Sequence, residues 1–165
     1  MKTLLLVRHA KSSWDQPGLS DFDRPLNERG KKDAPLMAKR VKEKSIDLDL
    51  LVSSPAKRAR QSARYFAEEF GFKKEEIRLV EDLYGATRRE FLQAIEELQD
   101  KFKTVALFSH NPGITDFASS LTNVRVDDMP TCAVFAVQAN AETWKEFMEA
   151  EKSFLFFDYP KNPLE

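Results

Sequence analysis

The chain has 165 residues, a length typical of one domain that can bury a hydrophobic core. Its 26 basic and 27 acidic residues leave a formal charge of −1, which disfavours a general attraction to nucleic acid or to an anionic membrane. A single cysteine excludes an internal disulfide framework, and no apolar stretch approaches the roughly 18 residues of a membrane span, so we expect one cytoplasmic domain over residues 1–165.

The first half of the chain predicts two strands, each followed by a helix. Residues 3–7 form a continuous apolar run, which is typical of a strand buried on both faces of a sheet. Asn27 is the predicted N-cap of a helix whose basic face we interpret as solvated, because acidic residues intersperse it. After a strand at residues 49–52, Ser54 is the predicted N-cap of a second helix, which Gly71 ends.

The second half continues the same alternation of strands and helices. In chain order we expect a strand at 78–80, a helix at 87–101, a strand at 105–108, a helix at 114–121, a strand at 133–137, a helix at 142–150 and a strand at 153–159. Alternating elements without an internal repeat or a low-complexity linker are typical of α/β proteins. The sequence therefore predicts a three-layer α/β sandwich.

Both histidines of the chain come directly after predicted strands. His9 follows the strand at residues 3–7, and His110 follows the strand at residues 105–108. Ligands of open α/β sheets bind outside the carboxyl ends of the strands. Either histidine alone would fit a structural, hydrogen-bonded role, but two at equivalent strand ends favour a shared functional site.

Two arginines indicate what such a site would bind. Arg8 precedes His9, and Arg58 lies one turn into a predicted helix whose N-terminus itself attracts anions. Each could be a surface ion-pair partner. Together they predict a phosphate or carboxylate site, because guanidinium groups pair with such oxygens through two hydrogen bonds. A metal site is disfavoured, since these cations would repel a divalent ion and no third ligand has a recognisable spacing.

A neutral imidazole in such a site can attack phosphorus and form a phosphohistidine intermediate that water then cleaves. Nearby cations would disfavour the imidazolium form and stabilise charge on the transferring group. A backbone carbonyl that accepts a hydrogen bond from the other ring nitrogen would hold His9 in the attacking tautomer.

Four segments in order resemble the motifs of the histidine phosphatase superfamily: LLLVRHA, RPLNERG, SSPAKRARQSA and LFSHNPG, which lie between residues 4 and 113. The loop DFDRPLNERG, the turn SHNPG and the closing FDYP resemble its small SixA-like phosphohistidine phosphatases. The resemblance implies a phosphoglycerate mutase-like fold, with a mixed, largely parallel central sheet flanked by helices. It implies a phosphatase without a metal or organic cofactor.

The resemblance also implies a role for each matching side chain. His9 would be the phosphorylated nucleophile, with Arg8 and Arg58 as phosphate ligands. His110 would donate a hydrogen bond to a phosphoryl oxygen, whereas Arg60 would point outward.

The general acid is the least defined part of the predicted site. One branch of the superfamily has an aspartate after the second histidine, where this chain has Asn111. Glu81 lies four residues before Gly85, as does the glutamate of the mutase branch, but it would equally fit a solvated loop carboxylate. A phosphohistidine substrate needs less help from an acid, because imidazole protonated on its second nitrogen leaves as a neutral molecule.

The leading hypothesis is therefore a phosphatase that acts on phosphohistidine in a partner protein, with a monomer as the default oligomeric state. A phosphatase for a small phosphoester is the main alternative. A mutase is less favoured, because the chain has few insertions to enclose a small substrate. A phosphate-binding module without turnover remains a third alternative. The sequence leaves open whether loop residues contact substrate, cap turns or orient neighbours: Lys11, Ser12, Asp21 and Asp23. Cys132 is predicted to be a small buried hydrophobic residue.

Overall fold

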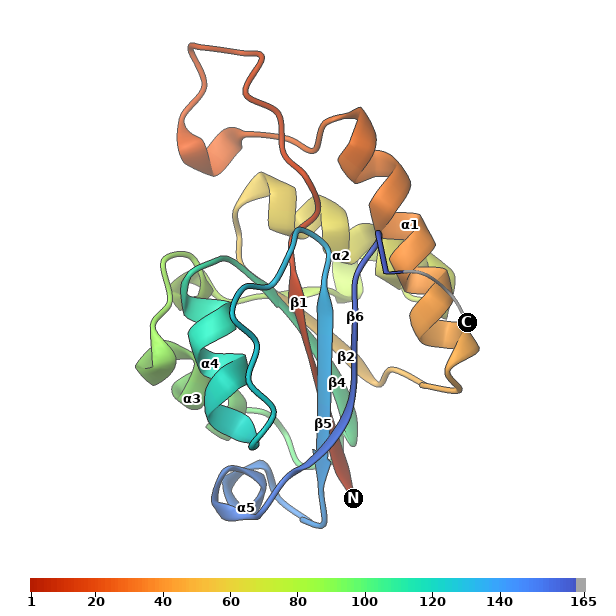
Figure 1. Cartoon of the computed structure of the whole chain (residues 1–165), viewed down its shortest axis with the longest axis vertical. Helices are drawn as coiled ribbons and strands as arrows, with labels where there is room; N and C mark the ends of the chain where they lie inside the picture. The colour runs from red at the N-terminus through yellow and green to blue at the C-terminus, as the bar shows by residue number, and fades with distance from the viewer. Residues whose placement is uncertain (163–165) are drawn as a thin grey trace.

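The computed structural model describes residues 1–162, so the predicted domain boundary at residue 165 lies outside it. A six-stranded sheet in the order β3-β2-β4-β1-β5-β6 lies between two layers of helices (Figure 1). The strands are β1 (Lys2–Arg8), β2 (Leu50–Ser53), β3 (Arg78–Leu79), β4 (Thr104–Ser109), β5 (Val134–Ala139) and β6 (Ser153–Asp158). The helices are α1 (Glu28–Glu43), α2 (Lys57–Phe70), α3 (Arg88–Glu96), α4 (Gly113–Leu121) and α5 (Trp144–Glu149). None of these described helices is long and apolar enough to cross a membrane.

The sheet is mixed and largely parallel, as predicted. β1 lies in the interior, parallel to β4 and antiparallel to β5. β2 pairs in parallel with both β4 and β3, and the edge strand β6 runs antiparallel to β5. The carboxyl ends of β1, β4 and β2 therefore lie at the same edge of the sheet, where ligands of such folds bind.

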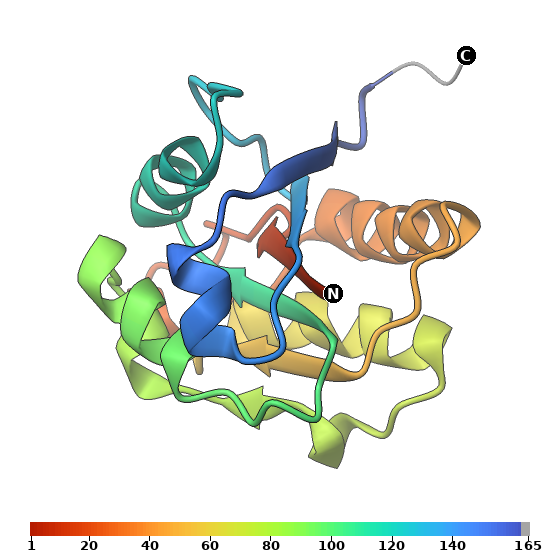
Figure 2. The same ribbon diagram turned by 90° about the horizontal axis from the view of Figure 1, so that it is seen from below.

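Helices cover both faces of the sheet (Figure 2), and the apolar run of β1 faces a hydrophobic core on each side. Leu5 and Val7 point toward α1 and α2, where Phe66 is fully buried. Leu4 and Leu6 point the other way, toward the core under α3, α4 and α5. Burying one such large apolar side chain contributes roughly 1.5–3 kcal/mol, so both faces of β1 hold the strand in place.

Of the three ends predicted for the first two helices, two are confirmed. The side chain of Asn27 accepts a hydrogen bond from the backbone N–H of Gly30 at the start of α1. Gly71 ends α2 with a left-handed backbone, φ 79°. The prediction that Ser54 caps α2 was wrong: this helix begins at Lys57 after an extended Ala56, and the Ser54 hydroxyl contacts a histidine instead.

The helix predicted at 87–101 is also shorter than expected, because α3 ends at Glu96. The chain then turns back toward β4 and is held by distant groups. The side-chain carboxylate of Asp100 accepts a hydrogen bond from the backbone N–H of Trp144. The backbone carbonyl of Asp100 accepts one from the Lys2 ammonium. Contacts from other parts of the chain therefore override the helical pattern of this segment. α5 is likewise shorter than its predicted range and begins after Thr143, whose hydroxyl accepts from the backbone N–H of Glu146.

Two glycines allow the loops after the histidines to pack closely on neighbouring backbone. A Cβ atom on Gly30 would lie 2.2 Å from the carbonyl oxygen of Lys11, and one on Gly113 would lie 1.9 Å from that of Ala86. Only glycine fits such close approaches. These contacts place the segments that follow His9 and His110 at the edge of the sheet.

Candidate active site

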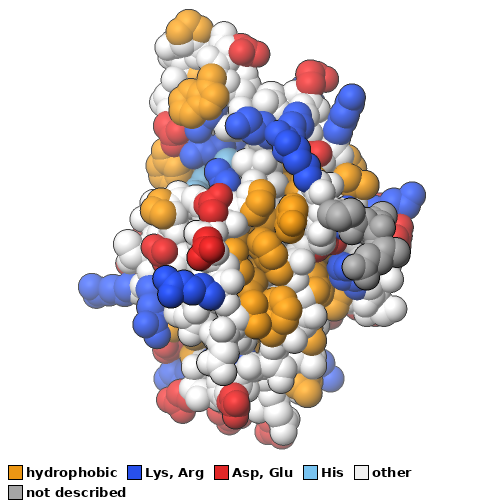
Figure 3. All heavy atoms as spheres, in the orientation of Figure 1, with side chains coloured by type: hydrophobic (Ala, Val, Ile, Leu, Met, Phe, Trp, Pro, Cys, Tyr) orange, Lys and Arg blue, Asp and Glu red, His pale blue; other side chains and the backbone are white. Residues whose placement is uncertain are grey.

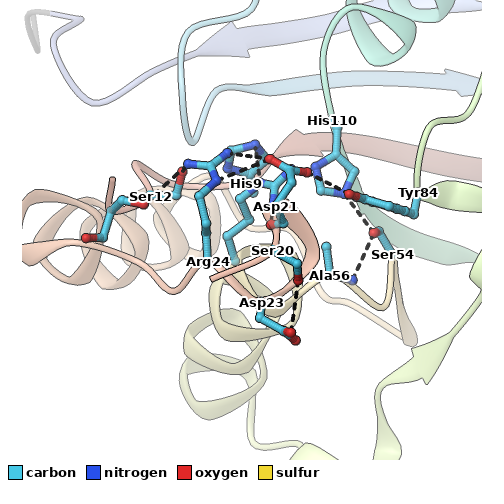
Figure 4. A network of polar contacts seen from close by, with 12 residues as sticks. His9, Ser12, Ser20, Asp21, Asp23, Arg24, Ser54, Ala56, Tyr84 and His110 are labelled. Atoms are coloured by element: carbon cyan, nitrogen blue, oxygen red, sulfur yellow. Dashed lines mark hydrogen bonds and ion pairs between the residues drawn. The ribbon is translucent and has the colours of Figure 1, made fainter. Parts of the chain in front are cut away.

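The two histidines and Arg58 come together where β1, β4 and α2 meet. The last residues of β1 and β4, Arg8 and Ser109, pair with each other, and the residue directly after each strand is a histidine. The imidazole centroids of His9 and His110 are 5.0 Å apart, and Figure 4 shows the two rings side by side. Arg58 lies in the first turn of α2, with its Nε 3.4 Å from the Nε2 of His9.

His9 is held in a defined tautomer. Its Nδ1 lies 2.7 Å from the carbonyl oxygen of Ala10, and a carbonyl can only accept, so Nδ1 carries the proton. Its backbone is fixed from both neighbouring strands, because its N–H donates to Ser109 and its carbonyl accepts from the N–H of Cys132. Nε2 therefore presents an unprotonated lone pair to the site, as an attacking imidazole requires.

The guanidinium of Arg58 is buried, with 5% of the residue exposed. It donates to the backbone carbonyl of Asp21 at 2.6 Å and to the Asp21 carboxylate at 3.0 Å. Arg60, two residues further on, is exposed and bonds the carbonyl of Pro55. The helix thus turns one arginine into the site and the other toward solvent.

Two buried nitrogen atoms at this edge have no hydrogen-bond partner among the described residues: Nε of Arg8 and Nδ1 of His110. Arg8 is otherwise anchored, since its NH1 donates to the carbonyl of Met129 at 2.8 Å. In residues 1–162 no three histidine, cysteine or carboxylate side chains are grouped to hold a metal ion. Buried polar groups are normally paired, so an anion that accepts from these atoms would complete the site.

Burial and the surrounding arginines keep both imidazoles neutral. Burial is the largest cause that lowers the pKa of His9, to about 3, with smaller contributions from His110, Arg58 and Arg8. Burial likewise lowers the pKa of His110 to about 4, with Arg58 next in importance. At neutral pH a lone pair on His9 is therefore available for attack.

These pKa values predict an acid-sensitive fold. As the pH falls below the ordinary histidine pKa of 6.5, the unfolded chain takes up protons on His9 and His110 while the folded chain does not. We expect the free energy of unfolding to fall by on the order of a few kcal/mol between about pH 7 and about pH 5. Urea unfolding across this range measures it. A His9→Asn, His110→Asn double variant should lose much of this slope, and an unchanged slope would contradict the assignment.

Asp21 connects the site to the loop of residues 11–25 (Figure 4). Its carboxylate accepts from the Tyr84 hydroxyl at 2.6 Å, from Arg58 and from Arg24. These hydrogen bonds, that from Tyr84 foremost, hold the pKa of Asp21 well below its usual range, so the group stays ionised. The sequence left Asp21 open, and it did not single out Tyr84.

The other loop residues that the sequence left open make different contacts. Ser12 is buried and its hydroxyl accepts from the guanidinium of Arg24 at 2.6 Å. Lys11 is exposed, and the carboxylate of Asp23 accepts from the hydroxyl of Ser20 at 3.0 Å. Figure 3 shows histidine atoms in a hollow below this projecting loop, with lysine and arginine side chains beside them. The loop therefore forms one wall of the site.

The segment EDLYG reaches the site through Tyr84 rather than through Glu81. The Tyr84 ring packs edge-on against His110, with centroids 5.5 Å apart. Glu81 is exposed, and its side chain makes no hydrogen bond or ion pair with another residue of the described part. Asn111 is engaged elsewhere, because its amide donates to Asp128 at 2.8 Å. The geometry thus gives no support to Glu81 as a general acid.

A cavity of about 280 Å³ adjoins the site on the side of His110. It is lined by residues 85–88, by residues 110–113 and by Asp116. The walls therefore come from the turn before α3 and from the start of α4.

Comparison with known proteins agrees with this geometry. Residues 4–87 match the family model of the histidine phosphatase superfamily, branch 1. An uncharacterised chloroplastic protein of Arabidopsis thaliana is 30% identical over 154 residues, which cover 88% of this chain and 70% of that protein. Phosphoserine phosphatase 1 of Hydrogenobacter thermophilus is 35% identical over 105 residues, covering 62% of this chain and 47% of that protein.

A solved structure shows the same architecture over almost the whole chain. SixA of Agrobacterium tumefaciens, a candidate phosphohistidine phosphatase, superposes with a TM-score of 0.80 at 26% identity, covering 96% of this chain and 98% of that one. Both the motifs and the arrangement of the strands are therefore shared. The chain belongs to the histidine phosphatase superfamily, as a phosphatase with a SixA-like fold.

Proposed function

We propose that the protein is a cytoplasmic phosphatase that removes the phosphoryl group from phosphohistidine in a partner protein, with His9 as the nucleophile. The proposal is supported by the unprotonated Nε2 of His9, which faces the guanidinium of Arg58. The unpaired nitrogens of Arg8 and His110 would complete a cradle of donors for the phosphoryl oxygens.

The reaction has two steps. Nε2 of His9 attacks phosphorus, the phosphorus–nitrogen bond of the substrate breaks, and the substrate imidazole leaves with the bonding electron pair. Arg8, Arg58 and His110 stabilise the charge on the transferring group. Water then attacks the phosphorus held on His9, the bond to Nε2 breaks with its electron pair returning to Nε2, and inorganic phosphate leaves with both protons of the water, as H2PO4−. His9 returns to its neutral form, ready for the next cycle.

The ionised state of Asp21 favours phosphohistidine over a phosphoester as the substrate. Among the described residues it is the one carboxylate hydrogen-bonded to any of the four proposed site residues, through Arg58, and its hydrogen bonds keep it without a proton. An alkoxide leaving group requires an acid, and an ionised carboxylate cannot supply a proton. A substrate imidazole that is protonated on its second nitrogen leaves as a neutral molecule and needs no such acid.

A small phosphoester is a second candidate substrate, favoured by the similarity to phosphoserine phosphatase 1 of Hydrogenobacter thermophilus. The cavity beside His110 could receive its leaving group, and Asp116 and Arg88 lie on its wall. An acid for this reaction would have to come from outside the hydrogen-bonded site, as Glu81 or Asp116 could.

A comparison of substrates tests the proposal. We expect kcat/KM for a histidine-phosphorylated protein to exceed that for phosphoserine or a sugar phosphate by about 100-fold or more, the effect of a missing general acid. Glu81→Gln and Asp116→Asn, which remove the two candidate acids, should each leave the faster reaction unchanged. Hydrolysis of the ester alone, with a strong loss in either variant, would establish the second candidate instead.

A further inference from the structure

We propose that Ser54 is a positioning residue, which holds His110 in the tautomer with its proton on Nδ1 and so presents that N–H to the phosphoryl group. The inference deepens the proposed function and rests on it, since it assigns His110 the part of a fixed hydrogen-bond donor. Ser54 itself would not touch the substrate.

The contact between the two side chains is short and shielded from water. Ser54 directly follows β2 and is fully buried. Its Oγ lies 2.7 Å from Nε2 of His110. The same Oγ accepts a hydrogen bond from the backbone N–H of Ala56 at 3.2 Å. Figure 4 shows Ser54 on one side of the His110 ring and His9 on the other.

The direction of the hydrogen bond follows from counting donors. If the Ser54 hydroxyl donates to Nε2, every polar atom of this group is satisfied: the hydroxyl hydrogen, the ring nitrogen and the N–H of Ala56. In the opposite direction Nε2–H would donate to Oγ, and the hydroxyl hydrogen would find no acceptor among the described residues. The first arrangement leaves one buried polar atom unpaired, the N–H on Nδ1 of His110, whereas the second leaves two, the hydroxyl hydrogen and the bare Nδ1. Each unpaired buried polar atom is costly, so the first arrangement prevails.

The far side of the ring points to the same tautomer. With Nε2 accepting from Ser54, the proton of the neutral ring lies on Nδ1. Nδ1 is buried, and no group in residues 1–162 bonds it, so its N–H is free to bind a ligand. The cations Arg58 and Arg8 act on this ring, and they would attract an anion to it. A bare lone pair at this nitrogen would instead repel phosphoryl oxygens.

The arrangement matters because His110 is not protonated at neutral pH. A protonated ring would offer an N–H on both nitrogens, whatever its neighbour did. A neutral ring offers one, and in water the two tautomers interconvert. Ser54 therefore replaces a mixture of states with a single donor aimed at the site.

Nitrogen NMR of uniformly labelled full-length protein tests the inference directly. The chain has only two histidines, so the ring nitrogens of both can be assigned. We expect the wild-type spectrum to show the proton of His110 on Nδ1. Addition of inorganic phosphate should shift the Nδ1 resonance of His110 more than its Nε2 resonance. A wild-type spectrum with the proton on Nε2 would overturn the inference without any variant.

Variants then separate positioning from folding. In Ser54→Ala we expect His110 to become a mixture of tautomers, His9 to keep its proton on Nδ1, and kcat to fall about tenfold or more. Ser53→Ala is the matched control, because Ser53 is equally buried but its hydroxyl donates to a backbone carbonyl. Ser54→Thr, which keeps the hydroxyl, should restore the single tautomer. An unchanged tautomer in Ser54→Ala would contradict the inference.

The spectra do not depend on turnover, so the two proposals can fail separately. A protein with the expected tautomers but no activity toward phosphohistidine would contradict the proposed substrate alone. An active wild type whose His110 tautomer does not respond to Ser54→Ala would contradict the positioning role alone.

Discussion

We expect the His9→Ala variant to lose phosphohistidine hydrolysis by about 10³-fold or more, because it removes the atom that would accept the phosphoryl group. The remaining donors around the site, among them Arg58, should still bind phosphate. In the wild type, brief exposure to the substrate followed by acid-free mass spectrometry should trap a phosphoryl group on His9. The variant should carry none.

Two outcomes of this experiment would contradict the proposal. Wild-type rates in His9→Ala would show that His9 is not the nucleophile. Phosphate binding by the wild type without a trapped adduct or turnover would identify a phosphate-binding module instead of an enzyme. The first conclusion requires a folded variant, and thermal unfolding of His9→Ala checks this: removing a buried imidazole that bonds a carbonyl should cost no more than about 3 kcal/mol.

Arg58→Gln has the second largest expected effect, a loss of about 10²- to 10³-fold in kcat, the usual cost of removing one donor to a developing oxyanion. The guanidinium faces Nε2 of His9 and is held in place by Asp21. Arg58→Lys should recover little of the loss, because an ammonium keeps the charge but not the planar fork. Steady-state kinetics on the histidine-phosphorylated protein measure both variants.

Arg60→Gln is the matched control for Arg58→Gln. It removes the same charge from the same helix, but its side chain is exposed and points away from the site. We expect its kcat to stay within about twofold of the wild type, since exposed charges are screened by solvent. Equal losses in the two variants would indicate a general effect of charge and would contradict a specific role for Arg58.

The features that the sequence predicts well are those encoded within one short segment. The continuous apolar run of β1 predicts a strand buried on both faces, as the structure has it. The position of His9 and His110 directly after predicted strands indicated that the two side chains lie close together at one edge of the sheet. The resemblance to the superfamily motif likewise implied that Arg58 faces the site and Arg60 points outward, and the structure places them so. The roles of His9, Arg8, Arg58 and His110 in catalysis remain predictions, which the variants above test.

The features that escaped prediction depend on residues far apart in the chain. Asp21 meets Arg58 and Tyr84, and Ser54 meets His110, across the edge of the sheet. No local pattern encodes these pairs, because they arise only when β1, β2 and β4 are in register. Capping rules predicted the Ser54 hydroxyl as the N-cap of α2, but the helix begins only at Lys57, and the hydroxyl bonds a buried nitrogen of His110 as well as the backbone N–H of Ala56.

The buried thiol of Cys132 bears on how the proposed site would respond to oxidants. The backbone N–H of Cys132 donates a hydrogen bond to the carbonyl of His9. Its thiol is fully buried, and burial raises the pKa of that thiol well above its usual range. Phosphatases that attack through a thiolate stop working when oxidants convert the sulfur to a sulfenic acid. Here the sulfur stays protonated and out of reach of peroxide, while the attacking atom would be a nitrogen outside that oxidation series. With His9 as the nucleophile and this cysteine buried, dephosphorylation would continue under oxidative stress.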